Sequence, residues 1–181
     1  MSKTSVRRLR TKTIYRGRVA TLSLDTLRTP SGGTYIRETI RHPVSVVILP
    51  VLDDGRVVMI RQFRHAANRV IWEIPAGTTE PGEPLLACAK RELAEETGYS
   101  ARRWRRSCGF YPAPGISTER MVVYVARGLR KLARPVPKDK DEQISVHPTP
   151  ARTVLHLLRT NRIVDAKTMI GILWGLGRIR W

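Results

Sequence analysis

Residues 77–99 read GTTEPGEPLLACAKRELAEETGY and contain three closely spaced carboxylates, those of Glu92, Glu95 and Glu96. Side chains three or four positions apart lie on the same face of an α-helix. Like charges at that spacing repel each other by roughly a few tenths of a kcal/mol per pair. A helix that keeps such a group of acids usually has a cation to bind, so we expect a cation at this face.

The same stretch predicts a helix over Pro84–Thr97. A proline at the start and Gly98 just past the end follow the usual asymmetry of helix termini. One apolar stripe has the spacing i, i+3, i+7 and consists of Leu86, Ala89 and Leu93. Glu92 and Glu96 lie off this stripe, so the helix is expected to bury one side and to present its acids on another.

The whole chain is strongly basic, with 33 Lys and Arg against 15 Asp and Glu and a formal net charge of +18. This charge fits either a basic surface without a ligand or attraction to polyanions such as nucleic acid, nucleotides or anionic membrane. Cys88 and Cys108 match no disulfide framework and no CxxC metal site. No secretory segment and no apolar run long enough to span a membrane is present, so we expect a cytoplasmic protein with no membrane partner.

The N-terminal region predicts a small antiparallel β unit. Residues 1–18 carry seven Lys and Arg and no acid, which favours a solvated, partly frayed arm over a nucleic-acid-binding arm. Residues 19–27 alternate apolar and polar, Pro30–Gly33 is a turn signal, and residues 34–40 form the return strand. Since a two-stranded hairpin is only marginally stable alone, it must pack on something, with a second subunit as one candidate.

The rest of the chain mixes strands with a few helices, which predicts an α/β or α+β layered domain. Residues 44–52 form an almost continuous apolar run, typical of a buried central strand. Further strands are expected over residues 57–62, 121–126 and 144–146, and the apolar segment 70–76 leads into Gly77. Arg102–Arg106, which includes Trp104, fits either base stacking or the exposed edge of a strand.

Two more helices are expected near the C-terminus, and one loop before them. The helices cover residues 150–160, with Thr149 as the cap, and residues 166–176, with Asp165 as the cap. Cys108–Gly115 is expected to be a loop, because it contains two prolines and two glycines.

Gly77–Tyr99 resembles the Nudix box, G-x5-E-x7-R-E-U-x-E-E-x-G-U with U apolar, at every fixed position; Tyr99 fills the last U as a bulky, partly apolar residue. The resemblance to Nudix hydrolases covers most of the chain. It implies an α/β (α+β) Nudix fold, in which a mixed β-sheet lies between helices and a small antiparallel β unit precedes it. We accordingly divide the chain into an N-terminal β unit, residues 1–43, and a Nudix hydrolase domain, residues 44–181.

The resemblance also implies a metal-dependent reaction, in which water attacks a diphosphate bridge. Hard divalent cations prefer oxygen ligands and share them with substrate phosphates. The implied cofactor is Mg²⁺, with Mn²⁺ as an alternative, and its implied ligands are the carbonyl of Ala76 and the side chains of Glu92 and Glu96. Arg91 is similar to the family arginine that orients these acids, and we assign it and the neighbouring Glu95 to catalysis. Glu83 is expected to add to this network from the loop side.

The flanking residues resemble the ADP-ribose pyrophosphatase and ADP-sugar branch of the family. That branch has a Pro-Gly element about fifteen residues beyond the box, and Pro114 and Gly115 stand there. Arg64 matches a substrate-contacting arginine, Arg37 and Glu38 an adenosine-side pair, and Glu119 a position near the terminal ribose. These substrate-binding residues are implied by the resemblance alone. The N-terminal hairpin resembles the unit that builds a domain-swapped homodimer in this branch.

The branch keeps its catalytic acid on a loop before the last strand, where this chain has Lys140-Asp141-Glu142. Glu142 is the candidate for metal ligand or general base, and Asp141 is the alternative. Some relatives have a second acid at the position of Lys140.

The favoured function is hydrolysis of ADP-ribose to AMP and ribose 5-phosphate. GDP-mannose or another nucleotide sugar is an alternative, because the aromatic residues of the N-terminal unit are only Tyr15 and Tyr35, which leaves the purine open. A nucleic-acid-binding or RNA-end-processing protein is an alternative of another class. A Nudix fold that only senses a ligand is disfavoured, since a sensor need not keep repelling carboxylates.

Overall fold

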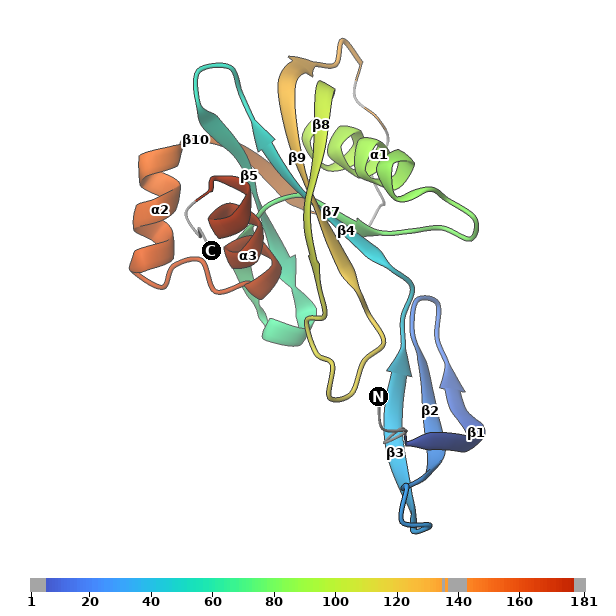
Figure 1. Cartoon of the computed structure of the whole chain (residues 1–181). Helices are drawn as coiled ribbons and strands as arrows, with labels where there is room; N and C mark the ends of the chain where they lie inside the picture. The colour runs from blue at the N-terminus through green and yellow to red at the C-terminus, as the bar shows by residue number, and fades with distance from the viewer. Residues whose placement is uncertain (1–5, 135, 137–142, 178–181) are drawn as a thin grey trace. The chain divides into compact units, whose positions relative to one another are not determined.

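A computed structural model describes residues 6–134, 136 and 143–177 (Figure 1). The chain forms two compact units. The first consists of Met1–Val44 and Tyr111–Arg120, and the second of Ser45–Phe110 and Met121–Trp181. Residues 111–120, which the predicted division assigns to the hydrolase domain, therefore group with the N-terminal unit.

The first unit is a three-stranded antiparallel sheet in the order β1-β2-β3. Its strands are β1 (Arg7–Arg16), β2 (Thr21–Arg28) and β3 (Thr34–Arg41). Residues 111–120 attach to β3, because Ile40 exchanges backbone hydrogen bonds with Ile116 and Thr118 at 2.7 and 2.9 Å. The small antiparallel unit expected from the sequence is thus confirmed, with one strand more than the predicted hairpin.

Strand β1 occupies part of the region that the sequence analysis assigned to a frayed basic arm, and that prediction is wrong. All ten residues of β1 are exposed, so the strand lacks the alternation of buried and exposed positions that reveals a strand. Its anchor is Asp25 on β2, whose carboxylate accepts hydrogen bonds from Thr11 at 2.5 Å and from Thr39 at 2.9 Å. Arg41 donates to both oxygens of the same carboxylate at 2.8 Å. One acid therefore links all three strands.

The second unit is built on a mixed seven-stranded sheet. The main order is β10-β5-β4-β9-β8, with β6 paired to β5 and β7 paired to β4. The strands are β4 (Ser45–Val51), β5 (Arg56–Arg64), β6 (Arg69–Glu73), β7 (Ala76–Thr78), β8 (Tyr99–Phe110), β9 (Met121–Lys131) and β10 (Ile144–Pro150). Strands β4 and β9 are parallel, whereas the other pairs are antiparallel. Every residue of β4 is buried, as its apolar sequence predicts.

Helices cover this sheet on both sides (Figure 1). They are α1 (Leu85–Thr97), α2 (Ala151–Arg159) and α3 (Ala166–Gly175), and a short 3-10 helix, η1 (His65–Ala67), joins β5 to β6. Helix α1 lies on one side of the sheet, and α2 and α3 lie on the other. The predicted Nudix-type architecture, a mixed sheet between helices, is therefore confirmed. In the described part of the chain, no helix is both long enough and apolar enough to cross a membrane.

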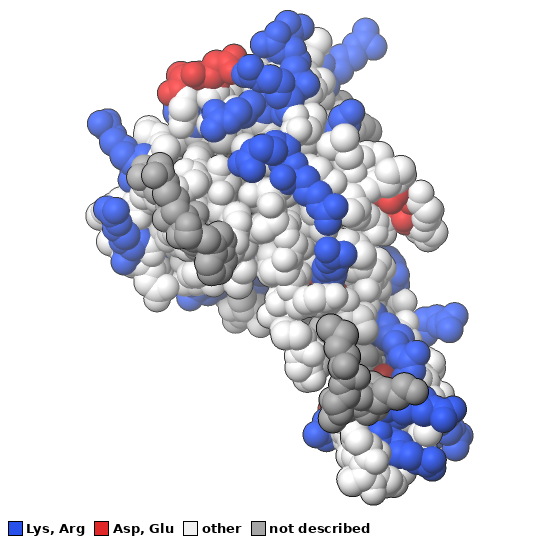
Figure 2. Space-filling model, in the orientation of Figure 1, with Lys and Arg blue, Asp and Glu red and all other residues white. Residues whose placement is uncertain are grey.

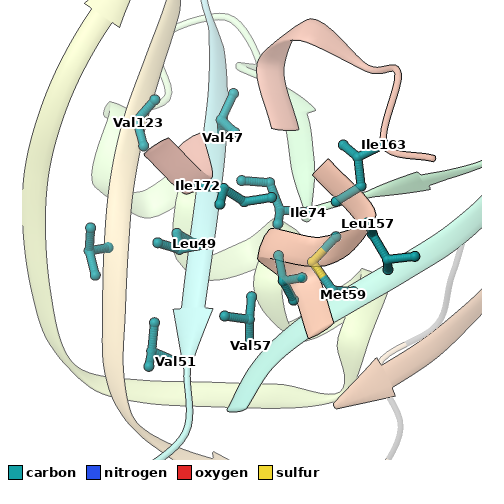
Figure 3. Packing of buried hydrophobic residues seen from close by; sticks show 12 residues of the cluster. Val47, Leu49, Val51, Val57, Met59, Ile74, Val123, Leu157, Ile163 and Ile172 are labelled. Atoms are coloured by element: carbon teal, nitrogen blue, oxygen red, sulfur yellow. The ribbon is translucent and has the colours of Figure 1, made fainter. Parts of the chain in front are cut away.

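The main core lies between the sheet and the pair α2 and α3 (Figure 3). It includes Val47, Leu49, Val57, Met59, Ile74, Val123, Leu157, Ile163 and Ile172. Two glycines let α3 approach the sheet closely. A Cβ atom at Gly171 would lie 2.4 Å from Cδ1 of Ile74, and one at Gly175 would lie 2.3 Å from Cδ2 of Leu49.

The predicted helix caps have different outcomes. Asp165 caps α3 as expected, since its carboxylate accepts from the backbone N–H of Thr168 at 3.0 Å. Thr149 does not cap α2. It belongs to β10 and donates to the carbonyl of His147, and α2 begins after Pro150 without a side-chain cap. A proline at the cap position supplies no side-chain acceptor, and its fixed φ alone favours the start of the helix.

The predicted loop over Cys108–Gly115 is wrong at its start, because β8 continues to Phe110. A register shift between Arg106 and Gly109 lets the strand pass this glycine and remain paired with β9. Such bulges are a common place for glycine in strands, and they weaken glycine as a signal for a loop.

Candidate active site

Helix α1 positions the acids of residues 77–99. It begins after Pro84 and ends at Gly98, whose φ of 71° is the left-handed conformation that glycine favours at a helix end. Its buried residues are Cys88, Ala89, Leu93, Glu96 and Thr97. The expectation that Leu86 is buried and Glu96 is off the buried side is therefore wrong: Leu86 is 37% exposed and Glu96 only 2%.

Glu96 is turned towards the sheet rather than towards solvent. Its carboxylate accepts a hydrogen bond from the backbone N–H of Ala76 at 2.9 Å. Ala76 lies on β7, which pairs with the buried strand β4. Of the four predicted metal ligands, Ala76, Glu92, Glu96 and Glu142, the structure thus brings Ala76 and Glu96 together where α1 meets the sheet.

Arg91 lies at the centre of the remaining acids. Its guanidinium donates to both carboxylate oxygens of Glu83, at 2.9 and 3.0 Å. Nη1 donates to Glu92 at 2.7 Å and to Glu95 at 3.0 Å, and Nη2 donates to the carbonyl of Thr78 at 3.2 Å. The positive charge of Arg91 therefore relieves part of the repulsion that the sequence predicts among these acids.

These contacts fix the charge states of the groups around Arg91. Hydrogen bonds from Arg91 lower the pKa of Glu83 to about 2, so this acid is ionised at neutral pH. The hydrogen bond to Glu83, together with the negative charge of Glu92, raises the pKa of Arg91. Burial raises the pKa of Cys88 to about 12, with a further contribution from the charges of Glu83 and Glu92. Cys88 therefore stays protonated, which disfavours it as a nucleophile.

Gly77 makes room for the carboxylate of Glu92. A Cβ atom at Gly77 would lie 1.9 Å from the carboxyl carbon of Glu92, well inside contact distance. Because the atom in the way belongs to the end of a flexible side chain, a larger residue can be accommodated if Glu92 moves. The glycine at this position therefore serves the placement of Glu92 more than the conformation of the backbone.

We expect Gly77→Ala to fold normally and to lower hydrolysis roughly 10- to 100-fold, as when the support of a metal ligand is removed. The methyl group displaces the Glu92 carboxylate, but it does not open a cavity. The check is a thermal melt together with kcat/KM at several metal concentrations, and Gly33→Ala, where an added Cβ meets nothing closer than 3.4 Å, is the matched control. Unchanged activity with an unchanged metal requirement would contradict this role.

The donor set here fits a hard divalent cation. Glu92 and Glu96 supply carboxylate oxygens, and Ala76 supplies a backbone carbonyl, which are the ligand types that Mg²⁺ prefers. Among the described residues, no three His, Cys, Asp or Glu side chains are gathered into a ready metal site. Glu142 and Asp141, the candidates for the further acid, lie outside the described residues.

Arg64 is held by an acid that the sequence analysis did not single out. Its guanidinium forms two hydrogen bonds to the carboxylate of Glu73, at 2.6 and 2.7 Å. Glu73 is fully buried and also accepts from Nζ of Lys167, which lies 3.0 Å from the carboxylate of Asp165. The signal in the sequence is an acid inside an apolar run, Val70-Ile-Trp-Glu-Ile-Pro-Ala, because a buried carboxylate needs cationic partners.

Charge also connects Arg64 to the acids of α1. The hydrogen bond to Glu73 is the main cause that raises the pKa of Arg64, and the charge of Glu96 adds to it. Burial by itself raises the pKa of Glu73, but the contacts with Arg64 and Lys167 outweigh it and leave this pKa lowered. The negative charge of Glu96 thus contributes to the raised pKa of Arg64, after the contacts with Glu73.

The other five predicted substrate residues lie in the first unit. They are Arg37, Glu38, Pro114, Gly115 and Glu119. Arg37 and Glu38 are exposed on β3, and the guanidinium of Arg37 lies 4.7 Å from the ring centroid of Tyr35. Pro114 and Gly115 are exposed, whereas Glu119 is half-buried, with its carboxylate 3.6 Å from Nδ1 of His42. Their roles towards a substrate stay predictions.

Comparison with known proteins shows the family and the fold of the chain. Residues 41–167 match the model of the NUDIX domain. The chain is 37% identical over 159 residues to the ADP-ribose pyrophosphatase of Bacillus subtilis (strain 168), which covers 88% of this chain and 86% of that protein. It is 35% identical over 164 residues to the methanol dehydrogenase activator of Bacillus methanolicus, and this match covers 91% of this chain and 89% of that protein. The crystal structure of an ADP compounds hydrolase superposes with a TM-score of 0.83 over 99% of this chain and 100% of that one; at 24% identity this likeness shows the fold alone.

Proposed function

Because this chain belongs to the Nudix hydrolase family, in the branch of the ADP-ribose pyrophosphatases, we propose that it hydrolyses ADP-ribose to AMP and ribose 5-phosphate. The observation that carries the proposal is the set of acids on α1, held between Arg91 and the backbone of Ala76. These acids suit a reaction at a diphosphate. The choice of ADP-ribose is supported by the name of the Bacillus subtilis relative and by the resemblance of the flanking residues.

The proposed cofactor is Mg²⁺, with Mn²⁺ as the alternative, held by Glu92, Glu96 and the carbonyl of Ala76. When bound, it supplies a Lewis acid that polarises phosphoryl oxygens and lowers the pKa of a bound water. Arg91 keeps the acids of α1 oriented, and Glu95 lies beside it as a further catalytic acid. Arg64, fixed by Glu73, offers its partly exposed guanidinium to a substrate phosphate.

The remaining roles come from the family resemblance. Glu142, or Asp141 in its place, takes a proton from the attacking water or adds a metal ligand. Arg37 and Glu38 bind the adenosine side of the substrate. Glu119 binds near the terminal ribose, and Pro114 and Gly115 shape the loop that contacts the substrate.

We further propose a homodimer through the first unit. Several large apolar side chains are exposed on its sheet, among them Ile14 at 48%, Tyr15 at 67% and Ile36 at 59%. Exposed apolar groups that gather on a small unit favour a protein partner, and a second copy of the chain is the partner that the resemblance implies. Sedimentation at micromolar concentration is expected to give a dimer, and a monomer alone would overturn this part of the proposal.

The function is tested with a panel of ADP-ribose, ADP-glucose, GDP-mannose, NADH and capped RNA, each with Mg²⁺ and with Mn²⁺. We expect the highest kcat/KM for ADP-ribose, with AMP and ribose 5-phosphate as the only products and no turnover in EDTA. A preference for GDP-mannose would keep the diphosphate chemistry but overturn the substrate. A preference for capped RNA would move the protein to the RNA-end-processing class.

A further inference from the structure

The edge of the seven-stranded sheet carries a dense row of basic side chains, which we name the basic strip. Its members are exposed and lie on β8 and β9: Arg102, Arg103, Arg105, Arg106, Arg127, Arg130 and Lys131. Figure 2 shows Lys and Arg side chains gathered over the region where Figure 1 places these two strands. Neither strand contains an Asp or Glu. None of these residues belongs to the candidate active site, so the proposed hydrolysis leaves the strip without a role.

Within the described part of the chain, little negative charge compensates the strip. Among the described residues, its only ion pair joins Arg103 to Asp53 at 3.9 Å, and both side chains are about 70% exposed, at 71% and 69%. Exposed pairs of this kind contribute little. Arg103 and Arg127 are direct cross-strand partners, and Arg105 lies on the same face of β8, so these three like charges create a positive field that attracts a polyanion.

A hollow of about 310 Å³ lies within the strip. Arg103, Arg105 and Arg127 line it together with Trp104 and Val125. The indole of Trp104 is fixed, because its N–H donates to the carbonyl of Ala101 at 3.1 Å and its ring meets Tyr124 edge to face at 6.3 Å. The hollow thus lies among three arginines, and Trp104 and Val125 complete its lining.

We propose that the basic strip binds single-stranded nucleic acid. Guanidinium forks bind phosphate oxygens in pairs, and their planes stack on bases. Arg103 and Arg127 are cross-strand partners, and Arg105 lies on the same face of β8, so these three suit neighbouring backbone phosphates, and the hollow that they line suits one base. An anionic membrane fits the strip less well, because membrane-bound faces insert apolar side chains, and none of the exposed large apolar residues of the described chain lies on β8 or β9.

The test measures binding of the full-length protein to a fluorescein-labelled uridine oligomer of about twelve nucleotides, a length within the usual site size. Fluorescence anisotropy is recorded over a series of salt concentrations. The strip variant carries Arg103→Gln, Arg105→Gln and Arg127→Gln. The control variant removes the same charge from the exposed arginines near α2, by Arg152→Gln, Arg159→Gln and Arg162→Gln. Thermal melts and ADP-ribose turnover of each variant show that the fold and the hydrolase site are intact.

We expect the strip variant to bind at least about tenfold more weakly and to lower the slope of log K against log salt by about 2, since each phosphate contact to a single strand contributes about 0.7. The control variant should stay within about threefold of the wild type in affinity and should keep its salt slope. Its arginines make no phosphate contacts in the proposed complex, and both quantities depend on the number of such contacts.

Equal losses in both variants would overturn the proposal, because net charge alone would then explain the binding. Absence of binding by the wild type would also overturn it, as would tighter, strip-dependent binding to vesicles containing phosphatidylserine. If the triple variant unfolds, the single variants Arg105→Gln and Arg127→Gln are measured against Arg152→Gln. Each strip variant should then lower the salt slope by about 0.7, and losses equal to that of Arg152→Gln would overturn the proposal.

Discussion

Glu96→Gln is expected to lower the turnover of ADP-ribose by roughly two to three orders of magnitude, as when one preorganised electrostatic group is removed from an active site. Glutamine keeps an oxygen that can accept the hydrogen bond from the N–H of Ala76, so α1 should remain seated on the sheet. What it removes is the negative charge at the proposed metal site. The measurement is kcat and KM at saturating Mg²⁺, together with Mg²⁺ affinity by calorimetry.

Glu80→Gln is the matched control, because it makes the same chemical change at an exposed position on the loop before α1. It should keep wild-type kinetics and metal affinity. Near-wild-type turnover of every nucleotide sugar by Glu96→Gln, with unchanged Mg²⁺ affinity, would rule out Glu96 as a metal ligand.

Glu73→Gln is expected to have the largest effect on stability, a loss of about 3 kcal/mol in the free energy of unfolding. Breaking a buried ion pair typically costs about 3–5 kcal/mol, because the remaining charge is left buried and unpaired. The lower end applies here, since Asp165 remains 3.0 Å from Nζ of Lys167 and the side chain of Arg64 is 41% exposed. Urea unfolding at neutral pH measures the change.

The reference for this prediction is Arg64→Gln, which leaves the pair of Glu73 and Lys167 in place and should cost clearly less. Combining Glu73→Leu with Lys167→Met should recover part of the loss, because neither of the two most buried charges is then left without the other. A loss of less than about 1 kcal/mol for Glu73→Gln, the size of an ordinary surface pair, would show that this carboxylate does not act as a buried ion-pair centre.

Glu73 should also influence how the free energy of unfolding changes at acid pH. The pKa of Glu73 is lower in the folded protein than its ordinary value of 4.5. Its contribution is therefore fully present above that value and is lost as the pH falls through the folded pKa. The unfolding free energy of Glu73→Gln should accordingly fall less steeply than that of the wild type below about pH 4.5.

How well the sequence predicts a helix or strand depends on which of its side chains are buried and which are exposed to solvent. Strand β4 and the start and end of α1 were predictable, since a continuous apolar run and a helix between Pro84 and Gly98 have distinct patterns. Strand β1 was not, because all its residues are exposed and it is held by backbone pairing with β2 and by the contact of Thr11 with Asp25. Local patterns report burial, and they are silent where a strand has no buried face.

The features of the candidate site also differ in how well the sequence predicts them. The acids of α1 were found from their spacing, but the burial of Glu96 was not, because a carboxylate is expected at the surface unless a partner is known. Its partner is a backbone N–H on β7, and the partners of Glu73 are Arg64 and Lys167, the latter 94 residues away. Such contacts arise only when distant segments fold together, so no local pattern contains them.

The two glycines of α3 bear on any attempt to redesign this enzyme. An added carbon atom at Gly171 or Gly175 would meet Ile74 or Leu49, which are fully buried in the core and, unlike Glu92 near Gly77, cannot move into solvent. Lys167 lies one turn before Gly171 on the same helix. A bulkier residue would lift the helix and carry that lysine away from Glu73. Substitutions at these two glycines should therefore lower activity, although they lie away from the acids of α1. Engineering for higher stability should leave α3 unchanged and should not replace its glycines with larger residues.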